Sequence, residues 1–162
     1  MVNTILITNL KVQKMKEYKI QIPINAPKEA VWKALTAFKN YPDWNSVLRL
    51  ENNDSLKVGN KFNVTIKKAG DKQSNFMAIV TSKEANKSFA ARQKIMGKWF
   101  FQATHHFMIE EIDKHHINFI QLWKLKGIVA ALFKKQIFKE LEEFKVMNRE
   151  LKLYVEKTNQ FN

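Results

Sequence analysis

The sequence contains no cysteine, and this absence removes several classes of protein at once. Without thiols the chain has no disulfide framework, no thiolate metal site and no cysteine nucleophile. Long apolar runs are missing too, since a membrane-spanning helix needs about 18 or more such residues. Residues 1–14 lack the cationic start and small-residue cleavage site of a secretory signal, so export by that route is not expected. We therefore predict a cytoplasmic protein without a transmembrane helix.

Acidic residues are also few. The chain has 28 Lys and Arg against 15 Asp and Glu, which gives a net charge of +13. Such an excess favours an anionic partner, although lysines that only keep the surface solvated give the same count. A hydrophobic fraction of 45% and a length of 162 residues predict one globular domain with a substantial core. We assign residues 15–162 to this domain and residues 1–14 to an N-terminal extension.

Glycine and proline, with 4 and 3 residues, are scarce enough to mark boundaries. Pro27 opens a helical pattern that follows the first strand pattern, and Gly127 separates the last strand pattern from the C-terminal stretch. Residues 128–157 carry apolar side chains every three or four positions, which predicts one long amphipathic helix. Alternation predicts strands over 18–24, 62–66, 76–80, 89–95, 101–109 and 117–125. This order indicates an α+β fold, with a curved antiparallel sheet of about six or seven strands against the last helix.

Several short segments occur in a characteristic order between residues 17 and 157. They are IPINAP at 22–27, VWKAL at 31–35, YPDWN at 41–45, VG at 58–59, HHF at 105–107, Gly127 and MN at 147–148. In these segments the chain resembles the SRPBCC or START-like superfamily, nearest its polyketide cyclase/dehydrase-type members. The resemblance implies the helix-grip fold: two short helices after the first strand, and a sheet wrapped around the C-terminal helix with a cavity for a hydrophobic ligand. It implies no single activity, because that superfamily includes lipid and sterol carriers, hormone receptors, cyclases and co-chaperone-like domains.

Strand alternation and the helix stripe indicate which side chains would face this cavity. Turns at residues 97–98 and 113–114 would centre two hairpins and so set the pairing of the last three strands. The predicted ligand-binding residues are Phe62, Val64, Ile66, Phe76, Val80, Ala91, Gln93, His105, Phe107, Phe119, Gln121, Trp123, Phe133, Ile137, Leu141 and Phe144. The predicted function is binding, with transport or sensing as its purpose, of a hydrophobic or amphipathic, anionic small molecule such as a lipid or polyketide-like compound.

Three polar side chains, Gln93, His105 and Gln121, fall on this otherwise apolar face. The pairing puts His105 opposite Ala91 and Trp123 and diagonal to both glutamines, where the three could orient the polar end of a ligand. Alternatively, His105 is a core histidine satisfied by a glutamine or a buried water. The runner-up function is a cyclase- or dehydratase-like enzyme that uses His105 as its base. No nucleophile or carboxylate is predicted beside it, and Trp123 stands where cyclase relatives often carry an acid, so catalysis is not favoured.

Two histidine pairs, at 105–106 and 115–116, invite a metal interpretation. Adjacent residues on a strand point to opposite faces, and no third ligand has the spacing of a tetrahedral site. Neither a metal nor a cofactor is therefore predicted.

Lysines and aromatic residues are expected to gather at one end of the sheet. Alternate turns of an antiparallel meander share an end, so the turns at 69–72, 96–99 and 126–127 should lie beside the start of the last helix. The predicted cavity rim is Lys98, Trp99, Phe100, Lys126 and Leu132. This combination suits an acidic headgroup or peripheral contact with an anionic membrane.

The alternative for this rim is that Trp99 and Phe100 pack within their hairpin while the lysines are solvated. Nucleic acid is not a favoured partner, because the chain has no recognised binding module. A protein partner docked on the rim or the helix, as in co-chaperone-like relatives, and the oligomeric state both stay open.

Overall fold

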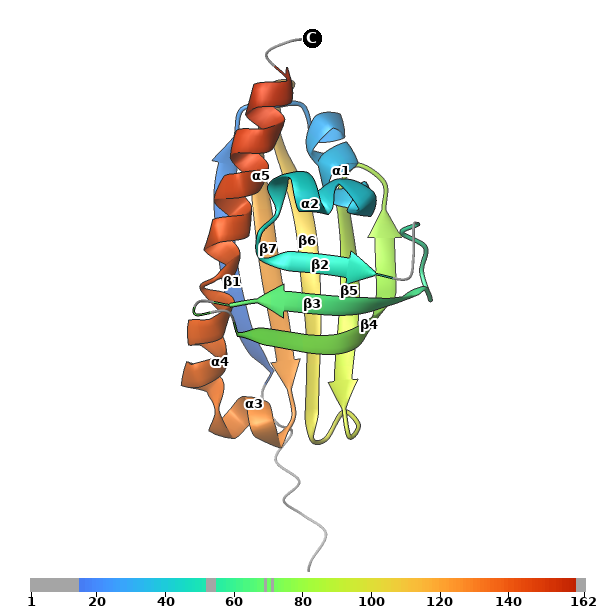
Figure 1. Ribbon diagram of the computed structural model, residues 1–162, viewed down its shortest axis with the longest axis vertical. Coiled ribbons are helices and arrows are strands. Elements are labelled where there is room, and N and C mark those ends of the chain that lie inside the picture. Colours follow the sequence, from blue (N-terminus) through green and yellow to red (C-terminus); the bar gives the residue numbers. More distant parts are fainter. Residues whose placement is uncertain (1–14, 52–54, 69, 71, 160–162) are drawn as a thin grey trace, which may run out of the picture.

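The computed structural model describes residues 15–51, 55–68, 70 and 72–159, and its elements follow the predicted α+β order (Figure 1). The predicted extension at 1–14 and part of the turn at 69–72 lie outside these residues. The elements are β1 (Lys16–Ile24), α1 (Lys28–Thr36), the 3-10 helix η1 (Phe38–Asn40), α2 (Tyr41–Trp44), β2 (Leu48–Glu51), β3 (Lys61–Lys67), β4 (Gln73–Glu84), β5 (Ser88–Ile95), β6 (Phe101–Asp113), β7 (His116–Lys126), α3 (Ile128–Leu132), α4 (Lys134–Leu141) and α5 (Phe144–Asn159).

One antiparallel sheet of seven strands, in the order β1-β7-β6-β5-β4-β3-β2, forms the body of the molecule. The sheet is strongly curled, so that β2, β3 and β4 cross in front of β5, β6 and β7 in Figure 1. Helix α5 lies along the concave side of the sheet, next to α1, α2 and β1. This arrangement is the helix-grip fold. No helix in the described ranges is both long enough and apolar enough to cross a membrane.

The register of the last three strands agrees with the prediction from alternation. His105 pairs with Ala91 on β5 and with Trp123 on β7. Gly97, at φ +89°, supplies the left-handed conformation that the turn between β5 and β6 requires. Because side chains alternate across a strand, this register turns His105 and its cross-strand neighbours toward the concave face.

The prediction of a single helix over 128–157 is wrong. The chain breaks at Phe133, which leaves the helical region at φ −108° and ψ 21°, and again between Leu141 and Phe144. At the second break the amides of Lys145 and Val146 donate to carbonyls three residues earlier, as in a tight turn. The apolar spacing continues through both breaks, because α3, α4 and α5 all place an apolar side on the same curved sheet. Of these three helices, α5 is the one that the sheet grips.

Tight packing fills one half of the concave side. Helix α5 turns Phe144, Met147, Leu151 and Val155 inward at steps of three or four, and all four are at most 1% exposed. The far half of α5 packs against α1 and β1, and its inward side chains belong to the buried core. The half nearer α4 is filled less completely, and the candidate site lies there.

Candidate functional site

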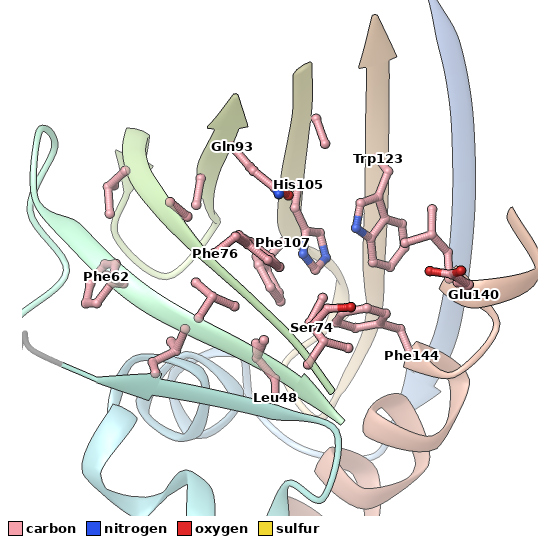
Figure 2. A pocket seen from close by; sticks show the side chains of 18 of the residues that line it. Leu48, Phe62, Ser74, Phe76, Gln93, His105, Phe107, Trp123, Glu140 and Phe144 are labelled. Carbon is pink, nitrogen blue, oxygen red and sulfur yellow. The ribbon is translucent and has the colours of Figure 1, made fainter. Parts of the chain in front are cut away.

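A cavity of about 250 Å³ lies between the concave face of the sheet and the helices α4 and α5 (Figure 2). Its lining is mostly aromatic and aliphatic, because the strands place every second side chain on this face. The predicted residues that the structure brings together here are Phe62, Val64, Ile66, Phe76, Val80, Ala91, Gln93, His105, Phe107, Trp123, Ile137, Leu141 and Phe144.

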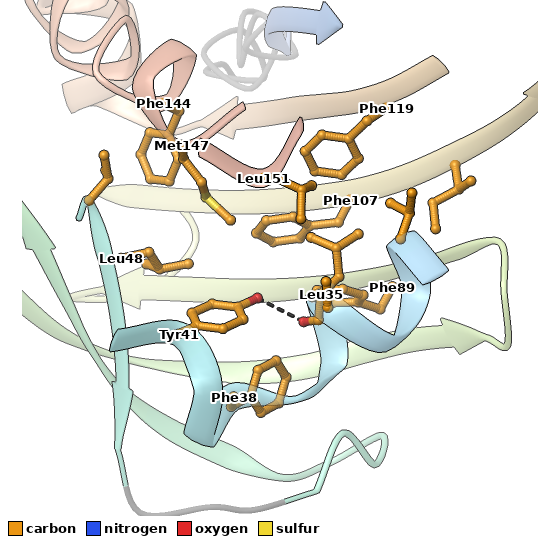
Figure 3. Close-up of a cluster of buried hydrophobic side chains, with 14 of the residues drawn as sticks. Leu35, Phe38, Tyr41, Leu48, Phe89, Phe107, Phe119, Phe144, Met147 and Leu151 are labelled. Atoms are coloured by element: carbon orange, nitrogen blue, oxygen red, sulfur yellow. Dashed lines mark hydrogen bonds between the residues drawn. The ribbon is translucent and has the colours of Figure 1, made fainter. Parts of the chain in front are cut away.

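Three residues of the predicted set lie away from this lining. Phe119 and Gln121 face the correct side of β7, but both are 0% exposed because α5 covers that part of the sheet. Figure 3 shows Phe119 beside Leu151 in the filled part of the core. Phe133 stands at the break between α3 and α4 and is 56% exposed. Alternation identifies the face of a strand, but it does not say which part of that face a helix covers.

Other lining residues were not predicted. Ala78, Phe89, Phe101, Ala103 and Leu125 follow the same alternation and could have been found from it. The remainder come from the short helices, β2, the loops, the start of β4 and α4, and the predicted strands did not include them. They are Phe38, Tyr41, Leu48, Leu50, Leu56, Lys68, Ser74 and Glu140.

Tyr41 is the one tyrosine in the lining, and its hydroxyl is already used. The Tyr41 hydroxyl donates to the backbone carbonyl of Leu35 over 2.7 Å, as the dashed line in Figure 3 shows. Burial raises the pKa of Tyr41 above its ordinary value, so the group stays protonated. Tyr41 therefore presents its ring, rather than its hydroxyl, to the cavity.

His105 is held by a chain of hydrogen bonds that crosses three elements. Gln121 Nε2 donates to Asn148 Oδ1 on α5 over 2.6 Å, which leaves Gln121 Oε1 facing His105 Nε2 at 2.8 Å. That oxygen can only accept, so His105 carries its proton on Nε2. The alternative predicted from the sequence was that a glutamine satisfies the hydrogen bonding of His105. The structure agrees with this alternative for the Nε2 atom. The other nitrogen, Nδ1, can accept a hydrogen bond and has no partner among the described residues.

Apolar surroundings keep this imidazole neutral. Its ring lies between Phe107 and Trp123, with centroid distances of 3.9 Å and 4.0 Å, and the edge of Phe144 lies at 5.2 Å. Burial lowers the pKa of His105 from its ordinary value of 6.5 to about 3. At neutral pH the side chain is therefore an uncharged hydrogen-bond acceptor.

The charged lining residues, Lys68 and Glu140, form a pair. Lys68 Nζ lies 2.6 Å from Glu140 Oε2, and this bond holds the pKa of Glu140 below its usual value. The pair joins the end of β3 to α4 at the edge of the cavity. Because the two charges cancel, the lining offers a ligand no unpaired charge among the residues described.

None of the predicted rim residues lines the cavity. Lys98, Trp99 and Phe100 form the turn between β5 and β6, whereas Lys126 and Leu132 lie at the end of β7 and in α3. The turn and α3 do lie together, as predicted, because Ile128 and Val129 donate to the carbonyls of Trp99 and Phe100. The residues described contain no cluster of three or more His, Cys, Asp or Glu that could hold a metal ion.

Comparison with known proteins finds similarity in structure alone. No family model matches the chain, and no curated protein sequence matches it. Among solved structures, the Zhui aromatase/cyclase of Streptomyces sp. R1128 is similar with a TM-score of 0.71 and 12% identity, over 88% of this chain and 94% of that one. A START superfamily protein from Mycobacterium smegmatis has a TM-score of 0.68 and 15% identity, over 88% of this chain and 98% of that one.

A third similar structure contains bound small molecules. It is norcoclaurine synthase from Thalictrum flavum in complex with dopamine and hydroxybenzaldehyde, with a TM-score of 0.68 and 10% identity, over 96% of this chain and 94% of that one. At such low identities the similarity extends to the fold and no further.

Proposed function

We propose, on the premise that the chain has the helix-grip fold of the SRPBCC or START-like superfamily, that it binds one small, uncharged, mainly apolar molecule carrying a hydroxyl group. The observation that carries this proposal is the unpaired Nδ1 of His105 in an apolar cavity. Small-molecule sites typically combine such apolar walls with a few oriented polar groups.

The size of the cavity limits the ligand. A dry apolar cavity of about 150 Å³ holds one benzene molecule. The cavity of about 250 Å³ therefore has room for a molecule of about two fused rings, or an apolar chain of similar volume. The dopamine and hydroxybenzaldehyde held by the similar norcoclaurine synthase are in this size range, which supports the assignment.

Two polar side chains define where the hydroxyl group would lie. His105 Nδ1 accepts a hydrogen bond, and Gln93 on the neighbouring strand β5 points into the same space (Figure 2). The Gln93 amide makes no side-chain hydrogen bond in the described part of the chain, so it can donate as well as accept. A hydroxyl placed between them donates to Nδ1 and accepts from the amide.

The charge of the ligand follows from the charges of the lining. An anion in this cavity would lose its hydration and gain no unpaired cation, since Lys68 is bonded to Glu140. The proposal therefore replaces the anionic ligand that the net charge suggested with a neutral one.

Binding accounts for His105 better than catalysis does. A general base works best when its pKa lies near the operating pH. With a pKa of about 3, His105 is a weak base, and the carboxylate in the lining, that of Glu140, is engaged by Lys68. The similar structures include enzymes, but at such low identity they carry only the fold, and the low pKa of His105 argues against a role as general base.

Calorimetric titration with three bicyclic probes tests the proposal. We expect 2-naphthol to bind more tightly than naphthalene by about tenfold, because one satisfied hydrogen bond in an apolar site contributes about 1.4 kcal/mol. We expect 2-naphthoate to bind most weakly, because its carboxylate meets no free cation. Equal affinity for 2-naphthol and naphthalene, or tightest binding of 2-naphthoate, would contradict the proposal.

Matched variants locate the interaction. Gln93→Leu and His105→Phe should each reduce the preference for 2-naphthol over naphthalene while leaving naphthalene bound. Gln102→Leu is the control, because Gln102 lies on the opposite face of β6 and does not line the cavity. If His105→Phe fails to fold, Gln93→Leu still decides the matter, since Gln93 is half-buried and its side chain carries no hydrogen bond among the described residues. An unchanged preference in Gln93→Leu would place the hydroxyl elsewhere.

A further inference from the structure

Six large apolar side chains are exposed together at one end of the molecule. Each is between 42% and 72% exposed, and we call the set the apolar tip. It consists of Ile95, Met96, Trp99, Ile128, Leu132 and Phe133. They come from the turn between β5 and β6 and from the segment containing α3, which lie side by side at the lower end of Figure 1.

The apolar tip is a preformed surface rather than two independent loops. The amide of Ile128 donates to the Trp99 carbonyl over 3.0 Å, and that of Val129 to the Phe100 carbonyl over 3.1 Å. Gly127, at φ +103°, allows this approach, since a Cβ there would lie 2.4 Å from the Phe100 carbonyl oxygen. The two segments therefore present their apolar side chains in one fixed arrangement.

Packing within the hairpin accounts for Phe100 but not for Trp99. Phe100 is half-buried, and its ring meets the Trp99 ring edge-on at 5.7 Å. Trp99 nevertheless remains 61% exposed. The turn covers much of the Phe100 ring but leaves the larger Trp99 ring in contact with solvent.

Lysines surround the apolar tip, and their positive charge is not balanced within the same two segments. The sequence has no Asp or Glu within residues 94–103 or 126–136. The exposed lysines there make no ion pair with any described residue, although Lys134 lies 5.2 Å from the Phe138 ring centre. They are Lys94, Lys98, Lys126, Lys134 and Lys135. A basic collar around a protruding apolar surface is complementary to a bilayer with anionic headgroups.

From this arrangement we propose that the apolar tip inserts into the interface of an anionic lipid bilayer, with the five lysines at headgroup level. The aliphatic members favour a lipid partner over nucleic acid, because Ile128 and Leu132 cannot stack on bases, whereas they gain free energy at the hydrocarbon boundary. Trp99 is the kind of side chain that concentrates at membrane interfaces.

Docking in this way is independent of the proposed function, but it would place the cavity near the membrane. The tip continues into α4, and α4 contributes Ile137, Glu140 and Leu141 to the cavity lining. The cavity therefore extends toward the end of the molecule that would meet the bilayer.

Sedimentation with lipid vesicles tests this proposal. We expect the full chain to bind vesicles of phosphatidylcholine with about 30% phosphatidylserine at about 0.05 M NaCl, and to bind pure phosphatidylcholine far more weakly. Trp99 fluorescence should shift to shorter wavelength on binding, since Trp44 and Trp123 are already buried and Trp32 lies on α1, half-buried against Phe89 and away from the tip. Trp99→Phe should remove the shift without abolishing sedimentation.

Two matched pairs of variants locate the contact. Leu132→Ser should weaken binding about tenfold, whereas Leu153→Ser should not, because these two leucines are similarly exposed at 72% and 68% but Leu153 lies on α5. Lys98→Gln with Lys135→Gln should weaken binding about 30-fold. Lys83→Gln with Lys157→Gln removes the same charge elsewhere and should have a much smaller effect.

Several outcomes would overturn the proposal. They are an absence of vesicle binding, equal binding to neutral and anionic vesicles, and equal effects of the tip variants and their controls. Binding to single-stranded RNA that requires Trp99 and is not competed by anionic vesicles would assign the surface to nucleic acid instead. None of these results bears on the naphthol titration, so docking and ligand binding can fail separately.

Discussion

At the scale of single residues, His105 shows how burial and hydrogen bonding act on one group in opposite directions. Burial among aromatic rings lowers its pKa, and the bond to Gln121 raises it by a smaller amount. The result is a neutral side chain whose Nε2 is bonded and whose Nδ1 has no partner in the part of the chain that the structure describes. A residue type that usually titrates near neutral pH is thereby converted into a permanent hydrogen-bond acceptor.

This low pKa predicts a pH dependence of the free energy of unfolding. Between pH 6.5 and about 3 the unfolded chain binds a proton on His105 that the folded chain does not, so stability is lost as the pH falls through this window. The loss from this group is at most about 1.4 kcal/mol per pH unit. Urea denaturation at several pH values would measure it.

The matched variant for this measurement is His105→Gln, which keeps a hydrogen-bonding group near Gln121 but cannot titrate. Other groups titrate equally in both proteins, including His106, whose pKa is also lowered by burial. The difference between the two proteins therefore isolates His105. Parallel curves for the wild type and the variant between pH 6.5 and 5 would mean that His105 titrates normally.

The sequence was enough to predict where His105 lies but not what it contacts. Its pairing with Ala91 and Trp123 follows from two turns and strict alternation. Its partner chain through Gln121 to Asn148 depends on where α5 crosses the sheet, and no local pattern encodes that crossing. The same fact explains why Gln93 borders the cavity while Gln121 is covered.

At the scale of elements, the C-terminal region shows the limit of periodicity. Apolar residues keep helical spacing from α3 to α5, although the chain bends twice, because each short helix faces the same concave surface. Strand pairing, in contrast, was predictable, since its period of two leaves only one arrangement that buries the apolar side. The lining contributed by β2 and the short helices had no comparable signal.

Gly127 joins the last strand to these helices, and its replacement tests how much the junction contributes. Gly127→Ala adds a Cβ that would lie 2.4 Å from the Phe100 carbonyl oxygen, in a conformation at φ +103° that other residues avoid. We expect a loss of about 3 to 5 kcal/mol in the free energy of unfolding, measured in urea.

The control is Gly59→Ala. Gly59 has a similar φ of +90°, but no atom of the described residues lies within 4 Å of the position that an added Cβ would take. Backbone strain alone should then cost about 1 to 2 kcal/mol. If both variants lost the same free energy of unfolding, the close approach of Gly127 to Phe100 would make no contribution to stability.

At the scale of the whole molecule, the net positive charge destabilises the folded state, whereas packing of the core stabilises it. The net charge is +13, and ion pairs such as those of Lys28 with Glu111 and Lys152 with Glu156 engage only a part of the 28 cationic side chains. Like charges repel in the compact state. The core has to compensate for this repulsion.

Screening should therefore stabilise the protein. We expect the melting temperature to rise by about 2–6 °C between about 0.01 M and 0.2 M NaCl, because the Debye length falls well below the size of the domain. Choline chloride should have the same effect as sodium chloride if general screening is the cause. A melting temperature that is independent of salt would show that the surface charges are too far apart to interact.

The hydrogen bonds from His105 through Gln121 to Asn148 connect the cavity to the helix that the sheet grips. Hydrogen bonds in series polarise one another, so a donor that engages Nδ1 makes Nε2–H a stronger donor, and the effect passes through the amide to α5. If a ligand donates to Nδ1, as proposed, its binding and the attachment of the helix are energetically cooperative. A bound ligand would therefore slow the local unfolding of α5 from the sheet.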